Sequence, residues 1–290
     1  MTGFAQFKER LMQIVFMLSA LTAIVAVGLI SVFLFASGLP TIFGLGISDF
    51  LLGYDWSPSD QPPSFGILPM IVGSIYVTVG AIILGVPIGI LTSVFMAKIC
   101  PPQIYKLIKP AVDLLAGIPS VVYGFFGIVV LVPFVRETFG GNGSSILTAS
   151  LLLAIMILPT IIGISESSLK SVPDELYEGA VALGASHERA VFGIILPAAK
   201  SGIMAAVVLG VGRAVGETMA VKMVAGNQAV LRLPTELLKG TRTLTANIVL
   251  EMGYAEGLHR QALIATGVVL FVLVLLINLL FSLINRRSDR

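Results

Sequence analysis

Six long apolar stretches constrain this chain more than any other feature of its sequence. They cover residues 11–36, 68–97, 111–135, 145–168, 199–225 and 262–285. Each is long enough for the roughly 20 residues with which a helix crosses the hydrocarbon core, and a helix satisfies its own backbone hydrogen bonds there. The 290-residue chain is 56% hydrophobic and 12% charged, whereas soluble domains carry about 25% charged residues. We therefore predict an all-α membrane protein with six transmembrane helices.

The first stretch is expected to be an uncleaved span rather than a signal peptide. It follows Lys8 and Arg10, and it is about twice as long as the apolar core of a signal peptide. The chain contains one cysteine, Cys100, and two separated histidines, His187 and His259. This distribution gives no reason to expect a metal site, and the net charge of +2 is too small to predict a nucleic-acid partner.

The basic residues predict the orientation in the membrane. One set of tails and loops holds Lys8, Arg10, Lys98, Lys106, Lys109, Lys170, Arg189, Lys200, Arg286, Arg287 and Arg290. The alternate side holds only Arg136, Arg232, Lys239, Arg242 and Arg260. Because cytoplasmic loops carry the excess of Lys and Arg, we expect both termini in the cytoplasm.

The pattern divides the chain into three parts. Residues 1–67 are expected to form the first transmembrane helix and an extracytoplasmic loop, residues 68–285 the remaining transmembrane domain, and residues 286–290 a cytoplasmic tail. A second outer loop, 226–261, contains "TELLKG" and "TLTANIVLEMGYAEGL", which are expected to form short helices at the interface.

Arg213 and Glu217 interrupt the fifth apolar stretch. Arg213 lies thirteen residues after Lys200, about 20 Å along a helix and near mid-bilayer. In a continuous helix Glu217 lies one turn further on, so the two side chains are expected to meet. Lys222 falls near the outer boundary, where its long stem can snorkel.

This pair of charges allows two interpretations. The first is an ion pair that locks helices together. The second is a substrate path, which is where ionisable groups in spans more often lie. A guanidinium fork suits an oxyanion such as phosphate, and Glu217 would weaken the grip of Arg213 enough to permit release.

The segment between the fourth and fifth stretches, "SVPDELYEGAVALGASHERAVFGIILPAAKSGI", predicts a helical elbow that projects from the bilayer. Pro173 and Asp174 are favourable starting residues for a helix, and Pro197 ends the segment before the fifth span. The elbow resembles the EAA loop of ABC-importer membrane subunits, whose pattern is E-A-A, three residues, G, nine residues, I-x-L-P. The matching residues are Glu178, Gly179 (where alanine is usual), Ala180, Gly184, Ile194, Leu196 and Pro197.

The resemblance implies a type I (MetI-like) permease fold in which residues 171–197 form the coupling loop. Glu178, Ala180 and Gly184 would then contact an ATP-hydrolysing partner. The chain has no G-x-x-x-x-G-K-[ST] phosphate loop. ATP-Mg would therefore be hydrolysed by partner subunits, and the chain itself is expected to be no enzyme and to bind no cofactor.

A second resemblance concerns the cargo. "LGVGRAVGETMAV", with "LPAAKSGI" and "DLLAGIPSVVYG", is similar to phosphate-specific ABC permeases of the PstC type, in which the Arg and Glu corresponding to Arg213 and Glu217 are implicated in phosphate passage. The family implies a prokaryotic cytoplasmic (inner) membrane, a PstA-type second permease, two PstB-type ATP-binding subunits and an extracytoplasmic PstS-type phosphate-binding protein.

Three other functions are weighed against phosphate import. The same architecture could import sulfate or molybdate, which arginine chemistry alone does not exclude. An intramembrane hydrolase using Ser165 or Ser120 is disfavoured because neither His187 nor His259 is placed to serve as a buried base. A self-powered secondary carrier would leave the elbow without a role.

Overall fold

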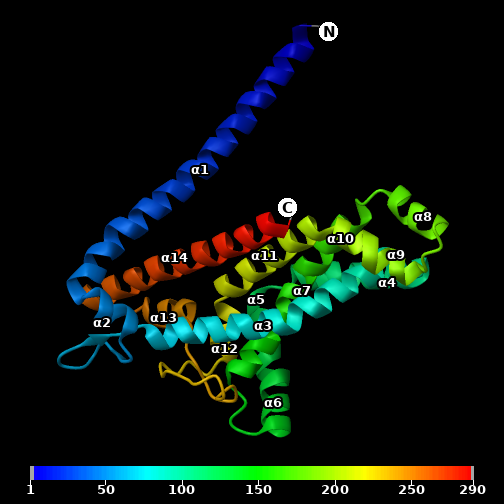
Figure 1. The fold of residues 1–290 in the computed structure, drawn as a ribbon. Coiled ribbons are helices and arrows are strands. Elements are labelled where there is room, and N and C mark those ends of the chain that lie inside the picture. Colours follow the sequence, from blue (N-terminus) through cyan, green and yellow to red (C-terminus); the bar gives the residue numbers. More distant parts are fainter. Residues whose placement is uncertain (1–2, 289–290) are drawn as a thin grey trace.

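The computed structural model describes residues 3–288, and almost all of its regular structure is helical (Figure 1). The helices are α1 (Gly3–Leu45), α2 (Ile47–Leu52), α3 (Leu68–Val94), α4 (Pro102–Gly117), α5 (Ser120–Phe126), α6 (Val132–Phe139), α7 (Ile146–Lys170), α8 (Asp174–Ala182), α9 (His187–Ala190), α10 (Leu196–Ala198), α11 (Lys200–Gly216), α12 (Met219–Val224), α13 (Leu244–Glu251) and α14 (Gly257–Ser288). The π-helical turns η1 (Phe95–Ile99), η2 (Gly127–Leu131) and η3 (Val191–Ile195) extend α3, α5 and α9, and strands β1 (Trp56–Ser57) and β2 (Ser64–Phe65) pair antiparallel.

Each predicted span has a helical counterpart, although several boundaries differ. Five helical segments are long and apolar enough to cross a membrane, and residues 200–216 pass the same test only together with 187–198, from which they are bent by 68°. The third span begins at Ser120 rather than at residue 111, because Ile118 and Pro119 take extended backbone angles after α4. The fifth was predicted to continue to residue 225, but α11 ends at Gly216.

Non-spanning elements gather at two ends of the molecule (Figure 1). One, the elbow end, carries α8, α9 and α10. The other, the loop end, carries α2, the β1–β2 hairpin and α13. The predicted tail 286–290 is still helical through Ser288, and its last two residues, like residues 1 and 2, lie outside the described part of the chain.

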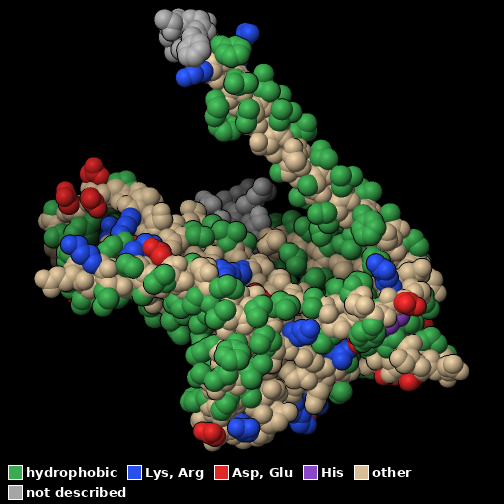
Figure 2. Space-filling model, turned by 180° about the vertical axis from the view of Figure 1, so that it is seen from behind, with side chains coloured by type: hydrophobic (Ala, Val, Ile, Leu, Met, Phe, Trp, Pro, Cys, Tyr) green, Lys and Arg blue, Asp and Glu red, His purple; other side chains and the backbone are tan. Residues whose placement is uncertain are grey.

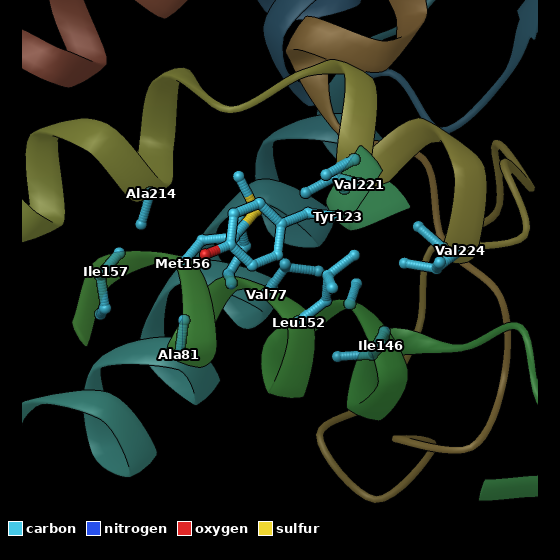
Figure 3. Close-up of a cluster of buried hydrophobic side chains, with 14 of the residues drawn as sticks. Val77, Ala81, Tyr123, Ile146, Leu152, Met156, Ile157, Ala214, Val221 and Val224 are labelled. Carbon is cyan, nitrogen blue, oxygen red and sulfur yellow. The ribbon is translucent and has the colours of Figure 1, made fainter. Parts of the chain in front are cut away.

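The core of the bundle is the contact of α3 with α7, with α11 beside them. Glycines on α3 allow the two helices to approach closely. A Cβ added at Gly85 would lie 2.8 Å from Ile157 Cδ1, and one added at Gly89 would lie 2.7 Å from Ile161 Cγ2. Figure 3 shows the buried cluster above this contact, where Tyr123 of α5 lies among side chains of α3, α7 and α12.

Helix α1 packs on the bundle only near its C-terminal end. Gly38 lies against Val268 of α14, and Phe35 meets Phe271 edge to face at 5.6 Å. The most apolar part of α1 buries nothing within the chain, and Figure 1 shows it leaning away from the other helices. Hydrophobic side chains dominate the surface of α1 in Figure 2, as expected of a helix that faces lipid.

The loop end is tied together by one buried carboxylate. Glu251 of α13 accepts hydrogen bonds from Trp56 Nε1 of the hairpin at 2.8 Å and from Arg242 Nη1 at 2.7 Å. Its second oxygen also lies 2.8 Å from His259 Nε2 of α14. The predicted interface helix in "TLTANIVLE" is thus a packed part of the fold, whereas "TELLKG" forms turns instead of a helix.

Candidate functional site

The fifth span is broken where its charged residues lie. Glu217 is extended (φ −69°, ψ 125°), so the chain leaves α11 and starts again as α12 at Met219. In Figure 3, Ala214 of α11 and Val221 of α12 lie on either side of this connection. Gly216, a helix stop, and Thr218, a good N-cap residue type, are the sequence signals that could have predicted the break.

The break separates Arg213 from Glu217. Among the described residues neither takes part in an ion pair with the other; instead Arg213 Nη1 lies 3.4 Å from Thr160 Oγ1 of α7, a long hydrogen bond. The expectation that the two side chains meet on one helix face is therefore wrong for this conformation. The reason is local, since the helix ends before Glu217 can complete the turn.

Arg213 lies on the open side of α11. Its side chain is half-buried, and a Cβ added at Gly212 or Gly216 would meet nothing within 4 Å. Tyr123 of α5 is close enough to interact with it electrostatically. Arg213 lies in the last turn of α11, and a cation inside a membrane is costly unless it faces a polar path or another protein surface. The open face around Arg213 provides room for either.

Glu217 holds the beginning of α12. Its Oε1 accepts hydrogen bonds from the backbone amides of Thr218 at 3.1 Å and Ala220 at 3.2 Å. These amides would otherwise be unpaired at a helix N-terminus, where negative charge is favourable. Glu217 is thus bound to backbone amides and not to a guanidinium.

Beside Glu217 is a small recess whose lining combines apolar side chains with four hydroxyl groups. Ser74 and Thr78 come from α3, and Thr243 and Thr245 come from the N-terminal end of α13. Thr245 Oγ1 lies 3.4 Å from the carbonyl oxygen of Glu217. These four residues were not predicted from the sequence, because isolated Ser and Thr in two distant segments give no signal that they meet.

Lys222 lies on α12 and is half-buried. Its carbonyl oxygen accepts a hydrogen bond from Asn227 Nδ2 at 2.7 Å. Its place at the outer membrane boundary stays a prediction.

The elbow is built as a rigid projection. Val191 and Ile195 are buried in one cluster with residues of α3, α7 and α11, and Lys98 Nζ lies 3.6 Å from Asp174. The Tyr177 hydroxyl and His187 Nδ1 are 2.9 Å apart and join α8 to α9. At the start of α9 the pKa of Glu188 is lowered, because its carboxylate accepts hydrogen bonds from its own backbone amide and the Ser186 hydroxyl.

A second tie at the elbow end holds α4 to α7. Glu166, almost fully buried, accepts the Tyr105 hydroxyl at 2.6 Å and Lys170 Nζ at 2.7 Å. Lys109 of α4 lies 3.4 Å from the same carboxylate and 3.1 Å from Asp113. Burial lowers the pKa of Lys109, but these two carboxylates outweigh burial and the net shift is upward.

The motif residues of the elbow do not share one surface. Glu178, Gly179, Gly184, Ile194 and Pro197 are exposed, and Leu196 is half-buried. Ala180, expected to contact a partner, is 6% exposed and packs within the elbow. In this arrangement Ala180 is not accessible to a partner.

Gly184 has a backbone reason to be glycine. It ends α8 with φ +88°, and the amides of Gly184 and Ala185 close the helix on the carbonyls of Val181 and Ala180 at 2.9 and 3.0 Å. A left-handed residue at this position is normally glycine. The preceding residue, Leu183, is 92% exposed, so an apolar side chain without a packing partner lies at the tip of the elbow.

Comparison with known proteins agrees with this architecture. Residues 85–290 match the family described as "Binding-protein-dependent transport system inner membrane component". The chain belongs to this family. It is 41% identical to the "Probable ABC transporter permease protein YqgH" of Bacillus subtilis, over 92% of this chain and 88% of that protein.

Two further comparisons bear on cargo and fold. A "Phosphate transport system permease protein PstC" of Mesorhizobium japonicum is 36% identical, over 93% of this chain and 88% of that protein. Among solved structures, the MetNI methionine ABC transporter in an inward-facing conformation superposes with a TM-score of 0.63 at 22% identity, covering 77% of this chain and 96% of that one. The predicted MetI-like permease fold is thereby confirmed.

Family membership settles the coarse function. This chain is a multi-pass permease subunit of an ABC importer of the inner membrane, and it is not itself an enzyme. The hydrolase alternative also lacks a serine–base pair among residues 3–288, because His187 contacts Tyr177, His259 contacts Glu251, and the Ser165 hydroxyl has no hydrogen-bond partner. Among residues 3–288 we find no group of three or more His, Cys, Asp or Glu side chains that could hold a metal ion.

Proposed function

We propose that this permease subunit imports inorganic phosphate. The proposal is supported by the PstC-named relatives, three of which are 31–36% identical over most of the chain, and by the Arg213 motif that resembles theirs. The observation that carries it is the state of Arg213, a half-buried cation with no carboxylate partner among the described residues. A tetrahedral oxyanion is the ligand that a guanidinium fork suits best.

In this proposal the partners are those of a phosphate system. A homologous PstA-type permease would cover the open face of α11, a PstS-type binding protein would deliver phosphate at the loop end, and two PstB-type subunits would hydrolyse ATP-Mg at the elbow end. The exposed Leu183, Glu178 and Gly179 would contact the ATPase. Closure of the ATPases would move the rigid elbow, and the motion would present Arg213 to each side in turn.

In this proposal Glu217 is not the counter-ion of Arg213. Because it caps α12, it links the substrate path to the helix that must move when the path opens. Its negative charge near Arg213 still opposes very tight anion binding, so phosphate can leave as well as enter. Sulfate or molybdate remains the second candidate, since either would also suit Arg213.

The test is uptake of labelled phosphate and labelled sulfate by cells that lack their own importers and carry the full complex. We expect phosphate uptake by the unaltered complex, and at least about a tenfold loss in Arg213→Gln, the effect of removing one charge-assisted hydrogen bond. Arg136→Gln, which removes an exposed arginine at the loop end, is the matched control and should transport normally. Wild-type uptake by Arg213→Gln, or uptake of sulfate but not phosphate by the unaltered complex, would overturn the proposal.

A further inference from the structure

The recess beside Glu217 contains unused hydrogen-bonding capacity of both kinds. Thr78 is 7% exposed, and its Oγ1 has no hydrogen-bond partner among residues 3–288. Ser74 Oγ accepts the amide of Leu244 at 2.9 Å, so its own proton is still available. Of the two Glu217 oxygens only Oε1 is bound, by the amides that it caps. The recess therefore offers hydroxyl donors on one side and a carboxylate acceptor on the other.

This arrangement favours anions that carry a proton over anions that carry none. An ionised carboxylate can only accept hydrogen bonds, whereas hydroxyls can donate them. A ligand that fits both must carry negative oxygens for the hydroxyls and a proton for the carboxylate. Phosphate at neutral pH carries at least one proton. Sulfate carries none, so it would place a negative oxygen against Glu217.

We infer that this recess, formed by Ser74, Thr78, Glu217, Thr243 and Thr245, is a selectivity subsite for a protonated tetrahedral oxyanion. Thr78 donates to an oxyanion oxygen, and Oε2 of Glu217 accepts the proton of the ligand. The subsite follows Arg213 along the chain, just beyond the end of α11, and we infer that a single anion passes from one to the other. This inference rests on the proposed function, because it assumes an oxyanion cargo.

The recess is closed in this conformation. It has room for about one water molecule, and an oxyanion needs several times that space. The walls belong to separate elements, however: Ser74 and Thr78 lie on α3, whereas Thr243 and Thr245 lie at the start of α13. The extended residue between α11 and α12 is the place where α12 can rotate, and the long contact from Thr245 to the Glu217 carbonyl is the bond that such an opening breaks.

Two pairs of variants test the subsite in the complete, reconstituted complex with its binding protein. Thr78→Val keeps the shape of the side chain and removes its hydroxyl, and Thr78→Ser restores the hydroxyl. We expect Thr78→Val to lower the maximal rate of phosphate uptake about tenfold, the effect of one hydrogen bond to a charged group, and Thr78→Ser to recover most of it. Ser150→Ala is the matched control, because it also removes a buried hydroxyl near α3, one that bonds the Val77 carbonyl, but Ser150 itself does not line the recess.

The second pair uses Glu217→Gln, which keeps Oε1 for the α12 amides. If Thr78 and Glu217 act on the same anion, the fold-loss of phosphate uptake in the Thr78→Val/Glu217→Gln double variant should be much smaller than the product of the fold-losses in the two single variants. An excess of sulfate should slow the residual phosphate uptake of the Glu217→Gln complex severalfold, because the glutamine amide can donate a hydrogen bond to sulfate. The same excess should leave phosphate uptake by the unaltered complex unchanged. Yields of assembled complex should be equal throughout.

Failure of the subsite and failure of the proposed function give different results. If the unaltered complex moves phosphate but Thr78→Val does so at the wild-type rate, or if the two losses simply multiply, the subsite is refuted and the function stands. If the unaltered complex moves another solute and not phosphate, the function fails, and with it the protonated-oxyanion cargo on which the subsite depends.

Discussion

Removing the Glu251 carboxylate should loosen the whole loop end. Glu251 is 7% exposed and contacts three separate segments through Trp56, Arg242 and His259. Glu251→Ala leaves a largely buried guanidinium without its carboxylate, and breaking such a buried pair costs about 3–5 kcal/mol. Glu251→Gln keeps an acceptor oxygen and should cost less, about 1–3 kcal/mol.

The single tryptophan of the chain makes this prediction measurable. Trp56 donates its indole N–H to Glu251 and lies edge to face on Phe65. Fluorescence of the purified chain in lipid nanodiscs therefore reports on this one site. We expect red-shifted emission and a lower unfolding midpoint in Glu251→Ala, with Glu251→Gln intermediate. Glu256→Ala, an exposed acid five residues further on, is the matched control. An unfolding free energy within about 0.5 kcal/mol of the unaltered chain, as is usual for a surface change, would refute the reasoning.

Other predictions concern packing, docking and orientation. Gly85→Val should destabilise the complex by about 1–3 kcal/mol, because the added atoms meet α7 at 2.8 Å; an unchanged thermal midpoint would contradict this packing. Gly179→Trp should abolish co-purification of the ATPase without unfolding the elbow, because a Cβ added at Gly179 meets nothing within 4 Å. Gly179→Ala is the control and should bind the ATPase normally. Equal yields of co-purified ATPase from the two variants would place the docking site elsewhere. With Cys100 replaced, a cysteine at Ser57 should react with an impermeant reagent from outside and one at Ser186 only from inside, and the reverse would overturn the orientation.

Much of the site was predictable because it depends on local sequence. Arg213 within an apolar span and the elbow at 171–197 were both placed correctly along the chain. The boundary errors were local too: Pro119 and Gly216 carry the signals that start the third span late and end the fifth early. The pairing of Arg213 with Glu217 failed because one extended residue changes the direction of every side chain after it.

The amino-acid sequence by itself determined which segments cross the membrane and where the elbow projects. Hydrocarbon offers no partner for backbone polar groups, so apolar length alone forces a helix, and the motif spacing of the elbow lies within one segment. Only the tertiary structure decided that hydroxyls of α3 and of the start of α13 meet beside Glu217. That outcome depends on contacts between residues about 170 positions apart, such as Ser74 with Leu244, and no local pattern encodes a neighbour that distant.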